Sequence, residues 1–519
     1  MRIAMPFLLL AFNALPLWGQ NTFSKRFHFG FPAAVLTSIV ATDSCYYATG
    51  VIADSISPHE AGNIFVRFSE QGEVELLKTI RDTAKSYQTW LNNLKVLPEG
   101  GFAAAGYTVD SLMKALLIVY NEYGDTVFTA QFPNPYYPDE SFIFTKDIET
   151  LENGYMLLNW IGSPEGINND EIQILRLNKE GELLWGKEYG IVSRDDTPHK
   201  IIYIQDGFII AAIRDNTNIV HQNYEARNHI FKVNEEGEIM WEYFSPSGEL
   251  RGKEGRAIAT SDGGLLVMTG QGIEVPAGTD AGQLRWHNYA FKLDSNRHEE
   301  WGVLVRDSFH AISYNNQLTS GIEVQDGSGY AVAGNLIEGT PEDGLYFDGV
   351  LAKISSDGVL LWKRYYQHIP SQNTRHFIND LAQAPDGGFI MVGEVRDTVN
   401  APRQQGWLLK VDEYGCLVPG CELVSGVQSS DDFKSSDDYT LLLYPNPVGE
   451  QLQLYFSAEE SAEYAFRILD AQGREWRRFS TRLHEVTLLL EVGELPGGVY
   501  YLQCLRNGKV VGVEGFVKR

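Results

Sequence analysis

Aromatic and arginine side chains are concentrated in three long polar segments of the chain, residues 220–229, 274–289 and 338–349. Side chains of these types dominate binding hot spots, because they bury a large area and can still donate hydrogen bonds. Segments that join strands also carry function more often than the strands themselves. We therefore predict a binding surface for a protein or glycan ligand here; the alternative is that the rings fold onto their own strands. The residues concerned are Tyr224, Arg227, Arg285, Trp286, Tyr346 and Phe347.

A second candidate is a basic residue that recurs at one position of a repeated strand. This basic stripe would form an anion-binding ring if every copy pointed inward. Its members are Arg67, Arg176, Lys232, Lys292, Lys353 and Lys410. Because each copy occupies the same place in its own repeat, an internal ion pair or a stem lying along apolar surface explains the pattern better than a shared ligand. The basic stripe is therefore predicted to be structural.

Residue patterns for catalysis and metal binding are sparse. The 11 His are scattered, and the segment RHEEW at 297–301 lacks the second His of a zinc-binding helix. We therefore predict no catalytic residue, no metal centre and no cofactor. The acidic segments 168–171 and 341–349 carry oxygen ligands that calcium can use, although solvated loops of this composition are more common.

The four cysteines divide into two kinds. Cys416 and Cys421 bracket the sequence Leu-Val-Pro-Gly, whose turn brings two sulfurs together. We predict a disulfide between them, worth about 2 kcal/mol through loop entropy. Cys45 and Cys504 lie far apart in the sequence, so each is predicted to be a free, buried thiol.

The strands that must position these residues repeat at intervals of about 50 to 65 residues. A glycine turn followed by a short alternating strand occurs at 100–108, 153–161, 206–214, 262–270, 327–335 and 386–394, with a weaker first copy at 43–51. Each is followed by an apolar strand, a polar turn and a further strand, and the apolar strand carries a member of the basic stripe in every copy but one, where Val119 takes that position. Together with the strand before each glycine turn, this pattern predicts four strands per copy and seven copies. Because a four-stranded sheet cannot bury both faces alone, we predict an all-β, seven-bladed β-propeller over residues 20–424, with six or eight blades as alternatives.

Four of the last strands end in tryptophan, at Trp185, Trp241, Trp301 and Trp362. The Gly-x-x-x-Trp spacing resembles the tryptophan motif of pyrroloquinoline-quinone dehydrogenases. No paired adjacent Cys accompanies the motif here, so packing between blades is the preferred interpretation. The alternative function is a secreted propeller enzyme acting on glycans, or a quinone-type dehydrogenase. Such an enzyme would need several carboxylates or a cofactor at one mouth of the ring.

The last copy lacks its fourth strand, because the segment CLVPGC at 416–421 turns where other copies continue. The segment FSKRFHFGFP at 23–32 is similar to LWKRYYQHIP at 361–370, a strand that the last copy needs. We therefore predict that the N-terminal strand completes the last blade and closes the ring, which removes an open sheet edge.

The N-terminus has the organisation of a secretory signal peptide over residues 1–19. Arg2 precedes an apolar run from Met5 to Trp18, which is too short to span a membrane and ends in Gly19. The net charge of −26 repels phosphate backbones and anionic lipid heads, so no nucleic acid partner is expected. The sequence predicts an exported protein without a transmembrane segment.

The C-terminal region begins after an acidic Ser/Asp linker, residues 425–440, and consists of alternating strands over 441–519. These strands predict a small antiparallel β-sandwich. The region resembles the type A C-terminal sorting domain of the type IX secretion system. The residues that carry the resemblance are Tyr444, Pro445, Asn446, Pro447, Asp470, Gly473, Leu495, Gly497, Gly498, Tyr500 and Lys518.

The resemblance implies passage through the periplasm and then the outer membrane by a dedicated translocon. It also implies that a sortase removes the tail at the cell surface, where the protein is attached or released. The polar linker offers extended backbone to that protease.

Overall fold

The computed structural model describes the chain in segments. These are residues 21–54, 60–134, 143–162, 171–190, 195–215, 226–249, 251–274, 284–305, 316–340, 344–369, 374–400, 402–417, 439–444, 446–458, 463–470, 473–481, 485–506 and 509–519. They form strands and turns without a helix, so the all-β prediction is confirmed for these segments. No helix among them is long and apolar enough to cross a membrane. The predicted signal peptide and nearly all of the predicted linker lie outside the described residues.

The strands of the body follow one another in antiparallel groups of four. The first three groups are β2 (Ala33–Ala41), β3 (Cys45–Ala53), β4 (Ala61–Ser69), β5 (Val74–Ile80); β6 (Ser86–Val96), β7 (Phe102–Val109), β8 (Met113–Tyr120), β9 (Thr126–Phe132); and β10 (Ile143–Leu151), β11 (Gly154–Ile161), β12 (Glu171–Leu177), β13 (Leu183–Tyr189). The next three are β14 (Asp195–Ile204), β15 (Gly207–Asp215), β16 (Arg227–Val233), β17 (Ile239–Phe244); β18 (Arg251–Ala259), β19 (Leu265–Glu274), β20 (Leu284–Leu293), β21 (Glu299–Leu304); and β22 (Gln317–Glu323), β23 (Tyr330–Thr340), β24 (Gly344–Ile354), β25 (Leu360–Tyr366).

The last group combines both ends of the body. It contains β26 (Thr374–Gln383), β27 (Phe389–Asp397), β28 (Gln404–Val411) and β1 (Phe23–Phe27). Strand β1 runs antiparallel to β28, with Phe23 opposite Lys410 and Phe27 opposite Gly406. This pairing confirms that the N-terminal strand supplies the missing fourth strand. Single parallel pairs, Ala33 with Gln404 and Phe347 with Arg375, link some groups into a larger sheet.

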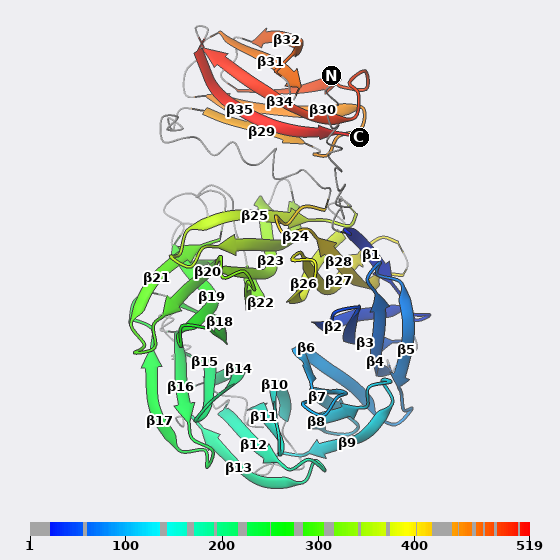
Figure 1. Ribbon diagram of the computed structural model, residues 1–519, viewed down its shortest axis with the longest axis vertical. Helices are drawn as coiled ribbons and strands as arrows, with labels where there is room; N and C mark the ends of the chain where they lie inside the picture. Colours follow the sequence, from blue (N-terminus) through cyan, green and yellow to red (C-terminus); the bar gives the residue numbers. More distant parts are fainter. Residues whose placement is uncertain are drawn as a thin grey trace, which may run out of the picture.

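The groups are arranged around a ring, with their first strands toward the middle and their fourth strands at the rim (Figure 1). Neighbouring groups contact each other through an aromatic ring and a glycine in the turn before the next group's fourth strand. A Cβ on Gly358 would lie 2.5 Å from the Trp301 ring, and Gly237 is similarly close to Trp185. At one turn Arg297, with φ of 70°, replaces the glycine, and its guanidinium lies 4.8 Å from the Trp241 ring. The prediction that the tryptophans pack between blades is confirmed at these positions.

The connections differ between the two faces of the ring. Turns between first and second strands and between third and fourth strands are short, for example 42–44 and 121–125. Connections between second and third strands and between groups are mostly longer, for example 216–226 and 305–316. Because neighbouring strands alternate in direction, the short turns share one face and the long connections share the other. We call the latter the long-loop face; the described parts of the predicted binding segments lie there, at the starts of β16, β20 and β24.

The C-terminal region forms two antiparallel sheets. One contains β29 (Tyr439–Tyr444), β30 (Gln451–Ala458) and β33 (Glu485–Glu491). The other contains β31 (Tyr464–Asp470), β32 (Glu475–Thr481), β34 (Gly498–Arg506) and β35 (Lys509–Lys518). Alternating apolar side chains of both sheets, such as Leu454, Phe466 and Phe516, share one buried core.

Candidate functional site

The basic stripe lies on the third strands and is bound within its own groups. Lys410 and Lys292 have side chains that are 0% and 1% exposed. Their ammonium groups donate to Asp386 at 2.9 Å and to Asp262 at 2.8 Å, and both aspartates belong to glycine turns. Lys232 pairs with Asp206 and Arg176 donates to Asn153, both in the glycine turns of their own groups, and Arg67 pairs with Glu75 on the neighbouring fourth strand. The prediction of a structural role is confirmed for these copies.

The predicted ligand-binding residues belong to three consecutive groups at the long-loop face. Arg227 opens β16, Arg285 and Trp286 lie near the start of β20, and Tyr346 and Phe347 lie near the start of β24. Tyr224 lies outside the described residues.

Two of these residues are engaged with neighbouring side chains. Arg227 donates from Nε to the Ser245 carbonyl at 2.6 Å, and its guanidinium lies 5.3 Å from the Phe244 ring. Phe347 carries the Arg375 guanidinium over its ring at 4.4 Å. Both contacts hold the side chains in fixed positions at the start of their strands, and Arg375 adds a third arginine to Arg227 and Arg285.

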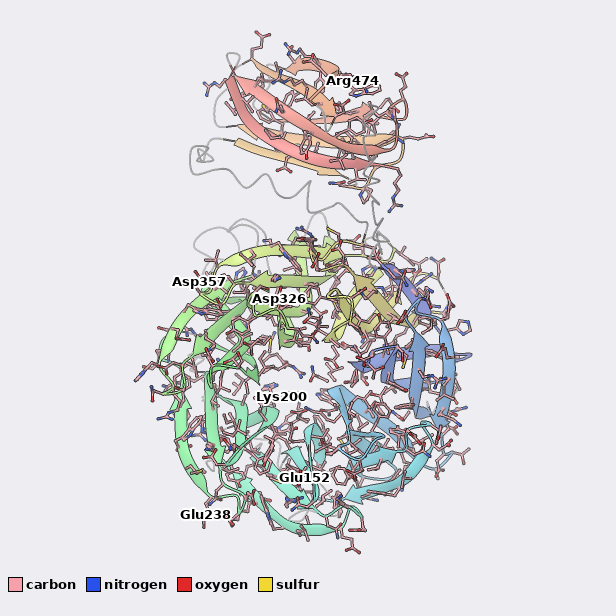
Figure 2. All side chains as sticks on the ribbon, viewed as in Figure 1. Glu152, Lys200, Glu238, Asp326, Asp357 and Arg474 are labelled. Carbon is pink, nitrogen blue, oxygen red and sulfur yellow. The ribbon has the colours of Figure 1, made fainter. Side chains whose placement is uncertain are left out.

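The first strands, which the sequence analysis did not single out, share an irregularity. In every group the pairing of the first strand with the second shifts register at a β-bulge or a similar irregularity. The shifts fall between Leu36 and Ser38, Thr89 and Leu94, Thr145 and Asp147, Pro198 and Lys200, Lys253 and Gly255, Leu318 and Ser320, and Ile378 and Asp380. Bulges re-aim side chains and are common beside functional sites. Figure 2 shows Lys200 pointing toward the middle of the ring.

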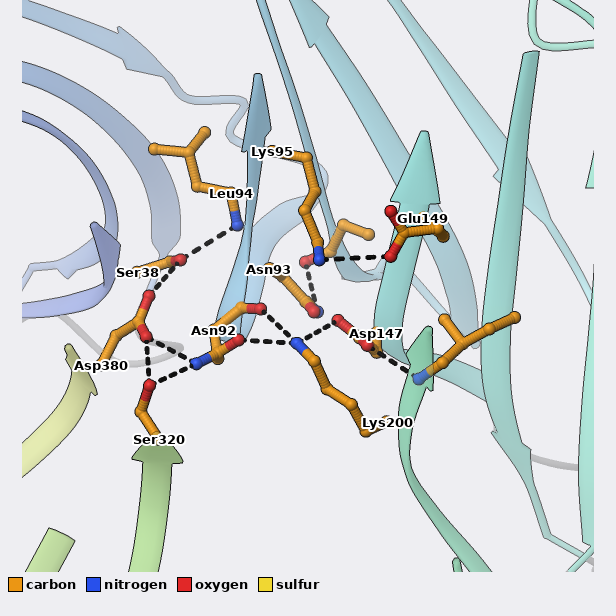
Figure 3. Close-up of polar contacts among 12 residues, drawn as sticks. Ser38, Asn92, Asn93, Leu94, Lys95, Asp147, Glu149, Lys200, Ser320 and Asp380 are labelled. Atoms are coloured by element: carbon orange, nitrogen blue, oxygen red, sulfur yellow. Dashed lines mark hydrogen bonds and ion pairs between the residues drawn. The ribbon is translucent and has the colours of Figure 1, made fainter. Parts of the chain in front are cut away.

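Asp380 is the centre of a hydrogen-bond network among the first strands (Figure 3). Its Oδ2 accepts bonds from Ser38 Oγ at 2.7 Å and from Ile39 N at 2.9 Å. Its Oδ1 accepts bonds from Asn92 Nδ2 at 2.5 Å and from Ser320 Oγ at 2.9 Å. Burial raises the pKa of Asp380, and these hydrogen bonds oppose the rise. The network joins strands β2, β6, β22 and β26.

Lys200 extends the network to the other side of the ring. Its ammonium group donates to Asn92 Oδ1 at 2.7 Å and to Asp147 Oδ1 at 3.2 Å. Burial lowers the pKa of Lys200, and Asp147 opposes that effect. Lys95 lies beside it, 3.4 Å from Glu149 Oε2. Burial alone would lower the pKa of Lys95, but Glu149 and Asp147 outweigh burial and raise it.

Asp147 and Asp380 share a structural role. Each accepts the backbone N–H of the first strand of the next group, Ile201 for Asp147 and Ile39 for Asp380, both at 2.9 Å. Asp147 is 1% exposed and Asp380 is 4% exposed. A buried backbone donor needs such an acceptor, so these carboxylates fix the spacing between neighbouring first strands.

Arg256 differs from these paired groups. It follows the bulge in β18, is 5% exposed, and has no hydrogen bond or ion pair to any residue that the structure describes; its Nε is buried without an acceptor. Its charge acts on Glu254 only at longer range. Burial would raise the pKa of Glu254, but His199, 3.1 Å away, and then Arg256 outweigh burial and lower it.

Backbone conformation also marks this region. Asn92 and Glu254 have φ of 60° and 57°, in the left-handed region that non-glycine residues seldom adopt. Such residues are found at binding sites more often than elsewhere, because the surrounding structure must hold them in place. Nearby, the Lys146 ammonium lies between 4.7 and 4.9 Å from the ring centroids of Trp90, Phe144 and Trp160.

A cavity of about 220 Å³ lies among the first strands. Lys95, Lys200 and Arg256 are the cations in its wall, and Asp380 is the carboxylate. The rest of the wall is formed by Asn92, Leu94, Ser320 and neighbouring polar and apolar residues. The lining is therefore rich in positive side chains, although the whole chain has a net charge of −26. The signal for this site in the sequence was weak, because the first strands carry no glycine turn or tryptophan motif.

The cysteine and metal predictions are only partly covered by the described residues. Cys45 and Cys504 are free and buried, as predicted. Cys421 lies outside the described residues, so its disulfide with Cys416 stays a prediction. Within the described segments no group of three or more His, Cys, Asp or Glu side chains could hold a metal ion. Most of segment 168–171 and the start of segment 341–349 are outside those segments.

Three pieces of the predicted sorting signal meet on β35, although they are far apart in sequence. The Asn446 side chain donates to the Gly515 carbonyl at 3.0 Å and accepts the Val517 N–H at 2.9 Å. Lys518 is paired with Gly498 across the sheet. The Pro-Asn-Pro segment, the Leu-Pro-Gly-Gly segment and the terminal Lys are therefore parts of one structural unit.

The remaining residues of the signal have mostly structural contacts. Asp470 Oδ1 accepts the Arg474 N–H at 2.9 Å, in a turn where Gly473 has φ of 80°. Tyr500 donates its hydroxyl to the Pro496 carbonyl at 3.0 Å. Leu495 packs against the core, and Pro447 precedes the buried Val448. Tyr444 ends β29 and Gly497 precedes β34. Pro445 lies outside the described residues.

Comparison with known proteins finds the secretion system C-terminal sorting domain family at residues 442–518. No curated protein matches the chain. Among solved structures, an apocarotenoid oxygenase/RPE65 chimera is similar at 10% identity over 76% of this chain and 94% of its own, with a TM-score of 0.37. Drosophila Plexin A in complex with Semaphorin 1b gives 9% identity over 76% and 87%, with a TM-score of 0.38.

A protein of unknown function from Bacteroides caccae gives 13% identity over 52% of this chain and 81% of its own, with a TM-score of 0.31. These structural similarities are too distant to carry an inference about function. The family match agrees with the contacts on β35 and with the resemblance found in the sequence. Residues 442–518 are therefore a type IX secretion C-terminal sorting domain, which follows a β-rich body that fits a repeat domain.

Proposed function

We propose that the chain is an exported binding protein of the cell surface or the medium. Its body, residues 20–424, is a seven-bladed β-propeller, and its tail, residues 441–519, is a β-sandwich that directs export and is then removed. The groups of four strands around a ring, closed by β1, support the propeller. The two sheets with a common core support the sandwich.

The observation that carries the export function is the sorting domain at 442–518. The partners are then the type IX translocon and sortase, reached through the periplasm after removal of the signal peptide. Deleting residues 441–519 should leave a folded body in the periplasm, because the closed ring does not need the tail. Protease resistance of the periplasmic fraction would test the folding, and export of the truncated chain would contradict the proposal.

The ligand of the long-loop face is proposed to be a protein or a glycan. Arginine and aromatic side chains start the third strands of three consecutive groups, which places hot-spot residue types on one face. Binding of the purified protein to glycan and protein arrays, repeated with Trp286→Ala, tests this. Tyr123→Ala, an exposed position in a short turn, is the matched control. A ligand lost equally with both variants would contradict the proposal.

A catalytic alternative is favoured by one observation, the raised pKa of the buried Asp380. Against it, both oxygens of this carboxylate already accept hydrogen bonds, two of them from backbone N–H groups. Asp380→Asn separates the two functions. Loss of a glycan-hydrolysing activity without loss of stability would support catalysis, whereas a lower melting temperature without any activity to lose would support the structural role.

A further inference from the structure

We propose that the cavity among the first strands binds a small organic carboxylate, with Arg256 as the side chain that pairs with the ligand's carboxylate. This site lies in the middle of the ring. It does not depend on the contacts proposed for the long-loop face, and it would exist even if that face bound nothing.

Arg256 is the residue that points to a ligand. A buried guanidinium without a counter-ion is costly, and proteins normally pair such charges. Two other buried cations follow this rule, since Lys292 is paired with Asp262 and Lys410 with Asp386. Arg256 is 5% exposed, lines the cavity and has no bonded partner among the described residues. A ligand carboxylate would supply the missing partner, and its two oxygens match the planar donor pair of arginine.

The neighbouring carboxylates are held by other partners. Glu254, which feels the charge of Arg256 only at longer range, is bonded to His199 at 3.1 Å. Glu149 lies 3.4 Å from Lys95, and Asp147 lies 3.2 Å from Lys200. These two carboxylates therefore face the lysines. With the lysines neutralised in this way, Arg256 is the cation of the wall that has no carboxylate in hydrogen-bond contact among the described residues, and its charge favours an anion there.

Asp380, the carboxylate in the wall, is occupied as well. Its oxygens accept bonds from Ser38, Asn92 and Ser320. Breaking these bonds to reach Arg256 would leave buried donors unsatisfied. The acceptor that Arg256 lacks must therefore come from outside the wall.

The size and lining of the cavity narrow the class of ligand. A volume of about 220 Å³ is below the usual range for drug-sized ligands and suits a molecule of about monosaccharide or amino-acid size. Ile39, Met268 and Ile322 give part of the wall an apolar character, which a carbon skeleton would use and inorganic sulfate would not. The amide of Asn92 and the hydroxyl of Ser320 offer polar contacts for hydroxyl or amino groups.

The site is also rigid enough to bind without rearrangement. Asn92 is held in the left-handed conformation, with its side chain bonded to Lys200 on one side and to Asp380 on the other. The first strands that carry these residues have their bulges fixed by pairing with the second strands. Groups held in this way lose little entropy when a ligand binds.

Calorimetric titration of the full chain tests the proposal. The probes are three organic acids, glucuronate, glutamate and succinate, with glucose and inorganic sulfate as comparators. We expect at least one acid to bind about tenfold more tightly than glucose or sulfate. Arg256→Gln should weaken that binding by about 10- to 100-fold, the usual worth of a charge-assisted pair, and Arg256→Lys should weaken it less. The matched control is Arg67→Gln, which changes an exposed arginine that pairs with Glu75, and this variant should bind the acid normally.

Thermal unfolding gives an independent readout. Because Arg256 has no bonded partner among the described residues, Arg256→Gln should melt at the same temperature as the wild type or higher. The acid should raise the melting temperature of the wild type and leave that of Arg256→Gln unchanged. Failure of all three acids to bind, equal binding by Arg256→Gln, sulfate binding more tightly than every acid, or failure of Arg256→Gln to fold would each overturn the proposal.

Discussion

The ring of Phe23 lies beside Gly72 in the position that Trp362 takes beside Gly415. A Cβ on Gly72 would be 2.6 Å from the Phe23 ring, and one on Gly415 would be 2.7 Å from the Trp362 ring. Phe23 belongs to β1 at the N-terminus, whereas Trp362 belongs to β25 within the chain. The N-terminal strand therefore supplies both the missing hydrogen bonds of β28 and the aromatic contact that joins the last group to the first.

Deleting residues 23–31 should lower the stability of the body sharply. The deletion exposes the edge of β28 and removes the packing of Phe23 on Gly72, so two interfaces are lost together. Thermal unfolding of the purified chain measures the effect. Lys25→Ala, which removes an ion pair with the largely exposed Glu73, is the control and should change stability by less than about 1 kcal/mol. Unchanged melting of the deletion variant would show that β1 does not close the ring.

The buried ion pairs of the basic stripe should matter more than the exposed ones. Asp386→Ala removes the carboxylate from Lys410, whose side chain is fully buried, and should cost about 2–3 kcal/mol. This is below the usual cost for a broken buried pair, because the Asp386 side chain is itself 34% exposed. Glu75→Ala, which breaks the exposed pair with Arg67, should cost less than about 1 kcal/mol. Urea unfolding compares the two, and equal costs would contradict the structural role of Lys410.

His376 should make stability depend on acid pH. Its Nε2 accepts the Ile369 N–H at 3.2 Å, and Nδ1 therefore donates to the Phe347 carbonyl at 3.1 Å. Burial lowers the pKa of His376 to about 4, well below its ordinary value of 6.5. Between these values the unfolded chain binds a proton that the folded chain does not. Stability should therefore be complete above about pH 6.5 and fall toward pH 4, by up to about 3 kcal/mol from this group.

The measurement is urea unfolding at pH 7.5, 5.5 and 4.5 for the wild type and for His376→Gln. Other histidines contribute to the wild-type pH dependence of stability, for example the half-buried His368, whose pKa is also lowered to about 4 by burial. The informative quantity is therefore the difference between the two proteins in how steeply the free energy of unfolding changes with pH. His376→Gln should lose less stability than the wild type on going from pH 7.5 to 4.5. Identical slopes would show that His376 does not titrate as the burial requires.

The sequence was sufficient to predict the parts of the fold that depend on local pattern. Glycine turns and alternating strands identified the second, third and fourth strands, and the tryptophans and the basic stripe were correctly interpreted as structural. The strand from Phe23 was found because it is similar to the segment at 361–370. Each of these features is visible within a short window of residues.

The central site could not be found in the same way. Its residues come from first strands that share no motif, and the bulges shift the alternation so that pattern no longer tells which side chains face the axis. Asn92 and Asp380 are 288 residues apart yet bonded to each other. Only the closed ring brings them together. A weak signal was present, because Lys200 precedes an apolar run, Ile-Ile-Tyr-Ile, in which a buried charge is unusual.

Cys416 and Cys421 should form a disulfide in the secreted protein. The Cys416 side chain is buried, and its N–H is fixed by the Asp412 carboxylate at 2.6 Å, so the end of the body is anchored before the Pro-Gly turn. Mass analysis of the untreated full chain should find the peptide two hydrogens lighter. Alkylation after denaturation should label Cys45 and Cys504 alone. Four labelled thiols would refute the pairing. If the disulfide forms, Cys421→Ser should lower the free energy of unfolding by about 2 kcal/mol.

The sorting signal should depend on the contacts that gather its pieces on β35. Asn446→Ala removes the bonds to Gly515 and Val517, which hold the Pro-Asn-Pro segment against the last strand. We expect export to fall several-fold, with intact chain accumulating in the periplasm, because the translocon would meet a tail whose parts are no longer held together. Leu489→Ala, a change at an exposed position of the same domain, should be exported normally.

The mature protein at the cell surface should also lack the C-terminal tail. Cleavage in the linker, residues 425–440, should leave a C-terminus there and remove everything from Tyr444 onward, and mass analysis of surface protein measures that end directly. The body should be unaffected by the loss, since its ring is closed by β1 and not by the tail. Asn446→Ala should then change where the protein is found without changing the melting temperature of the body. Surface protein that retains Lys518 would show that the tail is not removed. Normal export of Asn446→Ala with an intact tail fold would show that these contacts are not part of the sorting signal.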